Sequence, residues 1–162
     1  MHKCLVLSLL MVVGSAAAQE SAVVFKDVGA ESGLQPGNGA ACWADFNNDG
    51  WVDLCSGGVW KNNEGKSFSR IGQVSPGSVI AADFDNDGLM DLFSWSSLKL
   101  FRNTGDAEFV EFSLPELPRV GSRGAVWADL NGDGFVDLYV GGYEGSEHSL
   151  LVLINEDGKG FR

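Results

Sequence analysis

Hydrophobic residues beyond position 38 fall in short runs and not in long stretches with a helical period. The runs, for example VIAA, LKLF and LLVL, are rich in β-branched and aromatic residues, and Gly, Asn, Asp and Ser separate them. Short apolar runs bounded by turn-forming residues are typical of strands joined by tight turns. The pattern therefore predicts an all-β fold, with no helix after the N-terminal segment.

The strand pattern recurs three times around an acidic segment. The segments are 45-DFNNDGWVD-53, 83-DFDNDGLMD-91 and 129-DLNGDGFVD-137, here named loops 1, 2 and 3. A second landmark follows each loop, an asparagine with a phenylalanine six positions later: Asn62 and Phe68, Asn103 and Phe109, Asn155 and Phe161. A unit of this length that recurs with fixed internal spacing predicts a repeat architecture. We expect repeats over 39–76, 77–122 and 123–162, each of about four short strands, with the last one truncated.

The N-terminal region contains two further expected elements. Residues 1–18 read as a cleavable secretory signal, because Lys3 precedes an apolar run that ends in small residues. The apolar run is too short to span a membrane. Residues 19–38 are expected to form a strand and a linker, and the strand at 25–28 would complete the last sheet of a circular fold. We therefore expect the mature protein to be secreted, either periplasmic or extracellular.

Each acidic loop has the form D-x-[DN]-x-D-G-x-x-D, with side-chain oxygens at positions 1, 3, 5 and 9 and a usable backbone carbonyl at position 7. Glycine at position 6 permits the sharp turn that gathers these groups around one point. All the donors are hard oxygens, which suit calcium better than zinc or copper. We therefore expect about three calcium ions, one in each loop. The expected ligands are Asp45, Asn47, Asp49, Trp51, Asp53, Asp83, Asp85, Asp87, Leu89, Asp91, Asp129, Asn131, Asp133, Phe135 and Asp137.

Charge helps to distinguish a cation site from the alternative, a merely polar turn. The three loops hold 10 of the 22 acidic residues, and two like charges about 4 Å apart repel by about 1 kcal/mol in water and about 4 kcal/mol near a protein surface. A divalent cation reverses the sign of this interaction. An EF-hand is not expected, because it needs flanking helices and a bidentate Glu at position 12, where this chain has Ser56, Ser94 and Val140.

The loops and their flanking strands resemble the FG-GAP/VCBS-type repeats of integrin-alpha-like β-propellers. The matching segments are WADFNNDGWVDL, AADFDNDGLMDL and WADLNGDGFVDL, and the resemblance covers residues 22–162. It implies a propeller in which each loop joins the first two strands of a four-stranded blade and holds one calcium ion. Closed propellers have about four to eight blades. Three repeats therefore imply an incomplete propeller, and we expect further repeats of the same parent chain.

Two cysteines remain after the expected signal, Cys42 and Cys55, and they occupy repeat positions that are apolar elsewhere. The equivalent pairs are Ile80 with Phe93 and Val126 with Tyr139. Such pairs are expected to face each other across a hairpin, so the two cysteines are placed to form a disulfide in an oxidising compartment. The alternative is a pair of small buried hydrophobic residues.

Composition narrows the classes of partner and activity. The formal net charge of −11 argues against nucleic acid or an anionic membrane surface as a partner. Tryptophans could indicate a sugar platform, but Trp43, Trp60 and Trp127 occupy strand positions that are expected in the core. The chain contains neither a G-x-S-x-G nor an H-E-x-x-H motif, and we expect no enzyme activity.

These observations favour a secreted calcium-binding β-propeller module that serves as a non-catalytic adhesion or binding scaffold. The expected partner is an extracellular protein or carbohydrate. The alternative is an accessory propeller region of a larger extracellular enzyme whose catalytic residues lie outside this chain.

Overall fold

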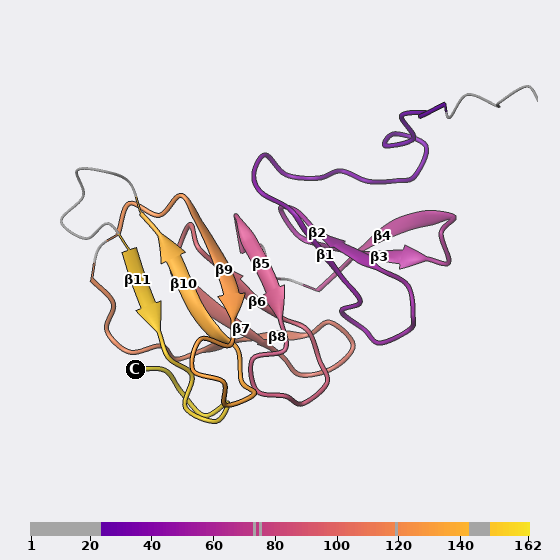
Figure 1. Ribbon diagram of the computed structural model, residues 1–162. Helices are drawn as coiled ribbons and strands as arrows, with labels where there is room; N and C mark the ends of the chain where they lie inside the picture. Colours follow the sequence, from indigo (N-terminus) through magenta and orange to yellow (C-terminus); the bar gives the residue numbers. More distant parts are fainter. Residues whose placement is uncertain (1–23, 73, 75, 119, 143–149) are drawn as a thin grey trace, which may run out of the picture.

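The computed structural model describes residues 24–72, 74, 76–118, 120–142 and 150–162. The expected signal at 1–18 and most of the loop between the last two strands lie outside these residues. Within the described residues the chain forms eleven strands and no helix, which confirms the all-β prediction (Figure 1). The described residues contain no helix that could span a membrane.

The strands form three antiparallel sheets that follow one another along the chain (Figure 1). Sheet 1 contains β1 (Cys42–Ala44), β2 (Asp53–Cys55), β3 (Val59–Asn63) and β4 (Ser67–Ile71). Sheet 2 contains β5 (Val79–Ala82), β6 (Asp91–Ser94), β7 (Lys99–Asn103) and β8 (Phe109–Phe112). Sheet 3 contains β9 (Gly124–Ala128), β10 (Asp137–Gly141) and β11 (Leu150–Leu153), and an isolated bridge joins Asn155 to Phe161. Each sheet is a meander in which neighbours in sequence pair, as in a propeller blade.

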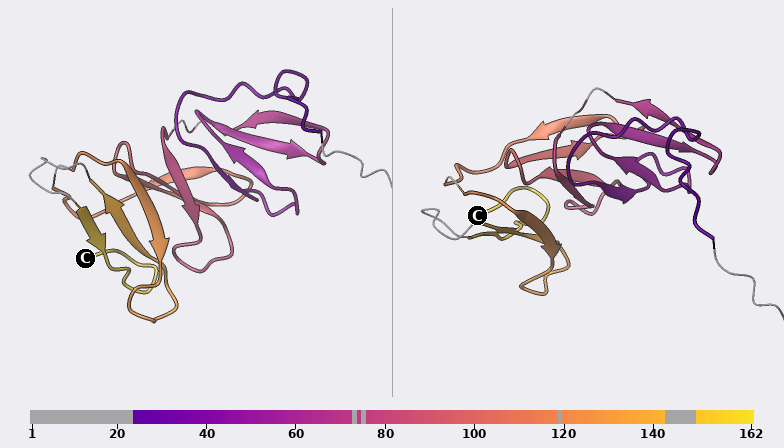
Figure 2. Two further views of the ribbon diagram at one scale, coloured as in Figure 1. Left: turned by 45° about the horizontal axis from the view of Figure 1, so that its top comes forward. Right: turned by 90° about the horizontal axis from the view of Figure 1, so that it is seen from above.

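The first strands of the three sheets lie beside one another, since β1 approaches β5 and β5 approaches β9. The sheets are thus arranged in series (Figure 2). They do not close into a ring within the described residues. This is the arrangement of consecutive blades in an incomplete propeller.

Side chains alternate across each sheet, and the alternation builds one apolar layer between each pair of sheets. Cys55 and Val59 of sheet 1 share a buried cluster with Leu92 of sheet 2. Phe93, the next residue along β6, points the other way and packs with Leu138 of sheet 3. A sheet in the middle of the series therefore buries both faces, which explains why β6 is buried at every position.

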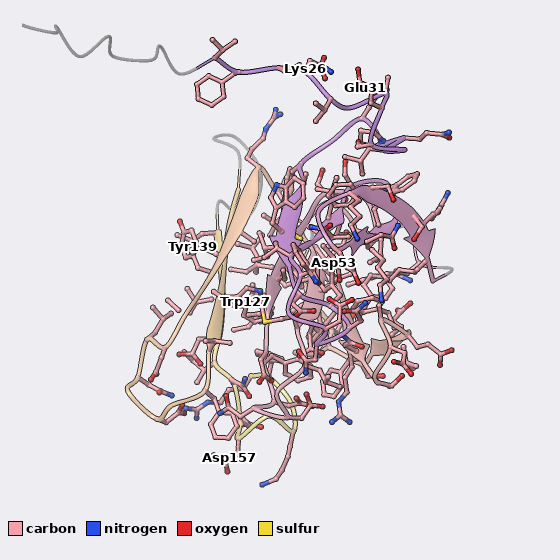
Figure 3. All side chains as sticks on the ribbon, turned by 90° about the vertical axis from the view of Figure 1, so that its right-hand side faces the viewer. Lys26, Glu31, Asp53, Trp127, Tyr139 and Asp157 are labelled. Carbon is pink, nitrogen blue, oxygen red and sulfur yellow. The ribbon has the colours of Figure 1, made fainter. Side chains whose placement is uncertain are left out.

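The outer face of sheet 3 is open. Val126, Tyr139 and Val152 are directly opposite one another in register and are 53%, 38% and 43% exposed. The equivalent residues Phe93 and Leu100 of sheet 2 are fully buried by sheet 3. Figure 3 shows Tyr139 and Trp127 on opposite sides of sheet 3, with Trp127 toward the rest of the molecule.

The prediction of a strand at 25–28 is wrong. Residues 24–28 form no strand, and the Phe25 side chain is 94% exposed. Among the described residues the segment pairs with no sheet edge, so its apolar side chains have no face to pack on. Instead the chain turns, with the Ser32 amide donating to the Val28 carbonyl, and Lys26 forms an exposed ion pair with Glu31 away from the sheets (Figure 3).

The expectation that all three tryptophans are core residues holds for two of them. Trp60 is buried, and Trp127 packs edge-on against Phe93. Trp43 is 56% exposed, although it occupies the position of Trp127 in its own repeat. No preceding sheet covers this face of sheet 1 among the described residues, and Trp43 lies on its end strand, β1, whereas Trp60 lies further in, on β3, and donates to the Ser56 carbonyl.

Cys42 and Cys55 lie directly opposite each other in the β1–β2 pair, as predicted. Both are free thiols in the structure. The hydrogen bond between the two thiols lowers the pKa of Cys42 and raises the pKa of Cys55. The facing arrangement is confirmed, and the disulfide itself stays a prediction.

Candidate metal centre

Each acidic loop connects the first two strands of a sheet, and its last aspartate is the first residue of the second strand. The three loops lie on the same side of the molecule, at the lower edge in Figure 1. We number the residues of each loop 1 to 9, as in the sequence pattern. The sheets thus present three copies of one loop side by side.

The aspartate at position 1 closes each loop by accepting backbone hydrogen bonds. Asp83 accepts from the Gly88 amide at 2.8 Å and from the Asp87 amide at 3.1 Å. Asp45 and Asp129 accept the equivalent bonds in loops 1 and 3. The glycine at position 6 has a φ of 86° to 91° in all three loops, a conformation that favours glycine. Glycine is therefore required at this position for the loop to close.

The aspartate at position 9 is fully buried in every loop: Asp53, Asp91 and Asp137. Its two oxygens accept two backbone hydrogen bonds. One comes from the amide of the residue at loop position 2, and the other from the backbone amide of the landmark asparagine. In loop 2 these are Phe84 at 3.1 Å and Asn103 at 2.8 Å. This carboxylate therefore braces the loop against the third strand, in addition to its predicted role as a ligand.

Loop 2 brings three of its predicted ligands together. One carboxylate oxygen from each of Asp83, Asp85 and Asp91 lies within 4.8 Å of the others. The Asp85 side chain is only 9% exposed, and its buried Oδ1 has no hydrogen-bond partner. A buried, unpartnered carboxylate oxygen is unfavourable unless another group, such as a cation, satisfies it. These residues therefore fit a hard divalent cation.

Loops 1 and 3 have asparagine at position 3, so each carries one carboxylate fewer. Among the described residues, no group of three carboxylates converges there as it does in loop 2. Asn47 and Asn131 each accept the amide of the aspartate at position 5 through Oδ1. The predicted donors at positions 1 and 3 are held in the loop, and loop 2 is the most strongly acidic of the three.

The residues at position 7, whose carbonyls are predicted ligands, are fixed through their amides. The Trp51, Leu89 and Phe135 amides donate to Oδ1 of the aspartate at position 5, at 3.0, 2.9 and 2.8 Å. The aspartates are Asp49, Asp87 and Asp133. Three predicted ligand positions of each loop are thus linked by direct hydrogen bonds.

A sequence model of the FG-GAP-like repeat family matches residues 45–94 and 83–140, more than half of the chain and all three loops. The chain belongs to the FG-GAP-like repeat family. No curated protein matches it.

Two of the three FG-GAP-like repeats carry a basic side chain that sequence reasoning missed. Arg102 lies 2.6 Å from Asp85 through Nε and 3.0 Å from Asp87 through Nη2. Lys61 lies 2.9 Å from Asp49 in loop 1. Both precede the landmark asparagine, where repeat 3 has Ile154. The sequence signal for these residues was the basic residue that directly precedes the landmark asparagine in repeats 1 and 2.

Burial shapes the titration of the loop carboxylates. Burial raises the pKa of Asp91 to about 7, and repulsion from Asp85 and Asp87 adds to the shift. Burial also raises the pKa of Asp85. The hydrogen bond from Lys61 instead lowers the pKa of Asp49. A cation in loop 2 would favour the charged form of the carboxylates that burial disfavours.

Two of the three landmark asparagines join one FG-GAP-like repeat to the one before it. The side-chain amide of Asn103 donates to the carbonyl of Phe46 in loop 1 at 2.8 Å, and the side-chain amide of Asn155 donates to the carbonyl of Phe84 in loop 2 at 2.8 Å. The Oδ1 atoms of both asparagines accept amides of their own turns. Their repetition was visible in the sequence, but their role needed the structure.

Gly158, in the turn of repeat 3, lies in close contact with loop 2. Its φ is +72°, and a Cβ at this position would lie 2.7 Å from the Asp85 Cα. The turn therefore lies against Asp85, which helps to explain the burial of that side chain. Loops 1 and 2 are accordingly each completed by elements of the following repeat.

Proposed function

We propose that this FG-GAP-like repeat chain is a calcium-binding β-propeller module that works outside the cytosol as a binding or adhesion scaffold. The observation that carries the calcium proposal is loop 2, where three carboxylates lie within 4.8 Å and the buried Oδ1 of Asp85 lacks a partner. Loops 1 and 3 follow the same hydrogen-bond pattern. We therefore extend the proposal to all three loops.

In loop 2 the ion would be held by Asp83, Asp85, Asp87, Asp91 and the carbonyl of Leu89, and in the other loops by the residues at the same positions. A bound calcium ion would replace the repulsion among these carboxylates with attraction. The protein's own contribution is to position the ligands through the backbone hydrogen bonds of positions 1, 5 and 9. Binding would thus make the loops more rigid.

A scaffold role is supported by the equivalence of the loops. Three copies that repeat the same backbone hydrogen bonds fit a shared structural purpose. The partner would be an extracellular protein or carbohydrate, and the loops or the open sheet faces offer the surface for it. The alternative is an accessory region of a larger extracellular enzyme.

Calorimetric titration of the chelator-treated full chain with calcium tests this proposal. We expect binding of about three ions and a weaker or absent response to magnesium, which requires a stricter octahedral geometry. The variant Asp85→Asn removes one carboxylate from loop 2 and should lower its affinity. Glu111→Gln, an exposed carboxylate outside the loops, is the matched control. Absence of calcium binding by the unaltered chain would refute the metal function.

A further inference from the structure

Neighbouring acidic loops are joined by a side chain from position 4. Asn48 Nδ2 of loop 1 donates to the Gly88 carbonyl of loop 2 at 3.0 Å, and Asn86 Nδ2 of loop 2 donates to the Gly134 carbonyl of loop 3 at 3.1 Å. The partners are 40 and 48 residues apart in sequence. The same bond is therefore made twice, always from one loop to the next.

The acceptor is a peptide group at the centre of the next loop. The Gly88 carbonyl belongs to the peptide that also contains the Leu89 amide, and that amide donates to Asp87 Oδ1 at 2.9 Å. In loop 3 the corresponding Phe135 amide donates to Asp133 at 2.8 Å. The asparagine thus fixes the peptide immediately before the residue whose carbonyl is a proposed ligand.

The donor asparagine is also adjacent in sequence to proposed ligands of its own loop. Asn86 stands between Asp85 and Asp87, and Asn48 holds the same place in loop 1. Both asparagines have positive φ, 54° for Asn48 and 56° for Asn86, a conformation that asparagine tolerates better than most residues. A displacement of the residues that flank the asparagine would therefore be transmitted through its side chain to the next loop.

We propose that Asn48 and Asn86 couple the three loops, so that a calcium ion bound in one loop raises the affinity of its neighbour. This inference rests on the proposed calcium function. Coupling between two sites requires a physical link between them. These bonds join position 4 of one loop, which lies between two proposed ligands, to the position-6 carbonyl of the next loop, which lies between two more. Asn103 and Asn155 form a second link between neighbouring loops, but their side chains donate to the carbonyl at position 2, away from the peptides of positions 5 to 7 that the bonds of Asn48 and Asn86 hold.

The third loop provides a natural comparison. Its position 4 is Gly132, with a φ of +80° and open space around an added Cβ. Glycine has no side-chain amide to donate, so the series of bonds runs from loop 1 to loop 3 and involves loop 2 twice. Loop 2 is also the loop in which the carboxylates converge and Asp85 Oδ1 is unpartnered. We expect loop 2 to be the most sensitive to the state of its neighbours.

The test is a calcium titration of the isotope-labelled full chain followed by nuclear magnetic resonance. The amides of Gly50, Gly88 and Gly134 each donate to the aspartate at position 1 of their own loop, so each reports on one loop. The substitution Asp133→Asn removes a proposed ligand carboxylate and should lower the calcium affinity of loop 3. We expect this substitution to weaken calcium binding at loop 2 by roughly two- to tenfold, the effect of one neutral hydrogen bond.

The same substitution is then made in an Asn86→Gly background. Glycine accepts the positive φ without strain and removes only the side chain, so the effect of Asp133→Asn on loop 2 should fall below roughly twofold. Asn48→Gly is the matched control, because it breaks only the bond between loops 1 and 2 and should leave the coupling of loops 2 and 3 intact.

The possible outcomes separate the two proposals. If no glycine amide responds to calcium, the calcium function is wrong and the coupling is wrong with it. If the amides respond but Asp133→Asn leaves loop 2 unchanged, or affects it equally with and without the Asn86 side chain, the calcium function stands and the coupling is refuted. Loss of the effect in Asn86→Gly alone supports the coupling.

Discussion

Replacement of Arg102 by methionine should have opposite effects on the ion-free stability of the protein and on its affinity for calcium. The guanidinium lies 2.6 Å from Asp85 and 3.0 Å from Asp87, both predicted ligands of loop 2. In the ion-free protein it neutralises part of the loop charge. In the ion-bound protein it would compete with the cation for the same two carboxylates.

The magnitude follows from these two contacts. The Arg102 side chain is 44% exposed, so each ion pair is screened and contributes about 0.2–1 kcal/mol. Removal of both should therefore destabilise the ion-free protein by about 0.4–2 kcal/mol. Release of the same interactions should tighten calcium binding at loop 2 by roughly two- to thirtyfold, because 1.4 kcal/mol corresponds to a factor of ten.

Urea denaturation in chelator and calorimetric titration with calcium measure the two quantities. Lys99→Met is the control, because Lys99 lies in the same strand and pairs with Glu111 at 2.8 Å, outside the acidic loops. We expect the control to change neither value by more than about 0.5 kcal/mol. If Arg102→Met weakens calcium binding, or leaves the ion-free stability unchanged, the guanidinium does not act as the counter-ion of loop 2.

Three further predictions concern the scaffold. Phe93→Ala should destabilise the protein by about 3–5 kcal/mol in urea denaturation, and Tyr139→Ala, at the same repeat position on the open face, by about 1 kcal/mol or less; similar losses would contradict the stacking of the sheets. Gly158→Ala should cost more than about 1 kcal/mol and weaken calcium binding, because its φ is +72° and its Cβ would lie 2.7 Å from the backbone of loop 2; an unchanged melting temperature would show that the turn does not press on the loop. Oxidation should join Cys42 to Cys55 and stabilise the chain by about 2–3 kcal/mol, measured by thiol titration and thermal unfolding; two titratable thiols after mild oxidation would refute the disulfide.

The sequence predicted the strands and loops because their signals are local and repeated. Three loops in the same register, flanked by short apolar runs, define a hairpin with an acidic connection whatever the rest of the fold does. The facing positions of Cys42 and Cys55 followed from the same register. Repetition made each of these signals stronger than it would be in a single copy.

The contacts between repeats could not be predicted in this way. The bonds from Asn103 to loop 1 and from Asn48 to loop 2 depend on how one sheet is placed beside the next, which no local pattern encodes. The error at 25–28 has the same origin, because a strand needs a neighbouring edge. Trp43 is exposed for a related reason, since the burial of a strand face depends on whether another sheet covers it.

Thermal unfolding of the full chain in calcium and in chelator tests the central proposal most directly. At a calcium concentration about 100 times the dissociation constant, each occupied site stabilises the folded state by about 2.7 kcal/mol, and each kcal/mol raises the melting temperature of a chain of this size by about 2–4 °C. We predict a rise of at least about 5 °C in calcium, reversed by chelator and reduced by Asp85→Asn. A melting temperature that is the same in calcium and in chelator would contradict a calcium-stabilised propeller module.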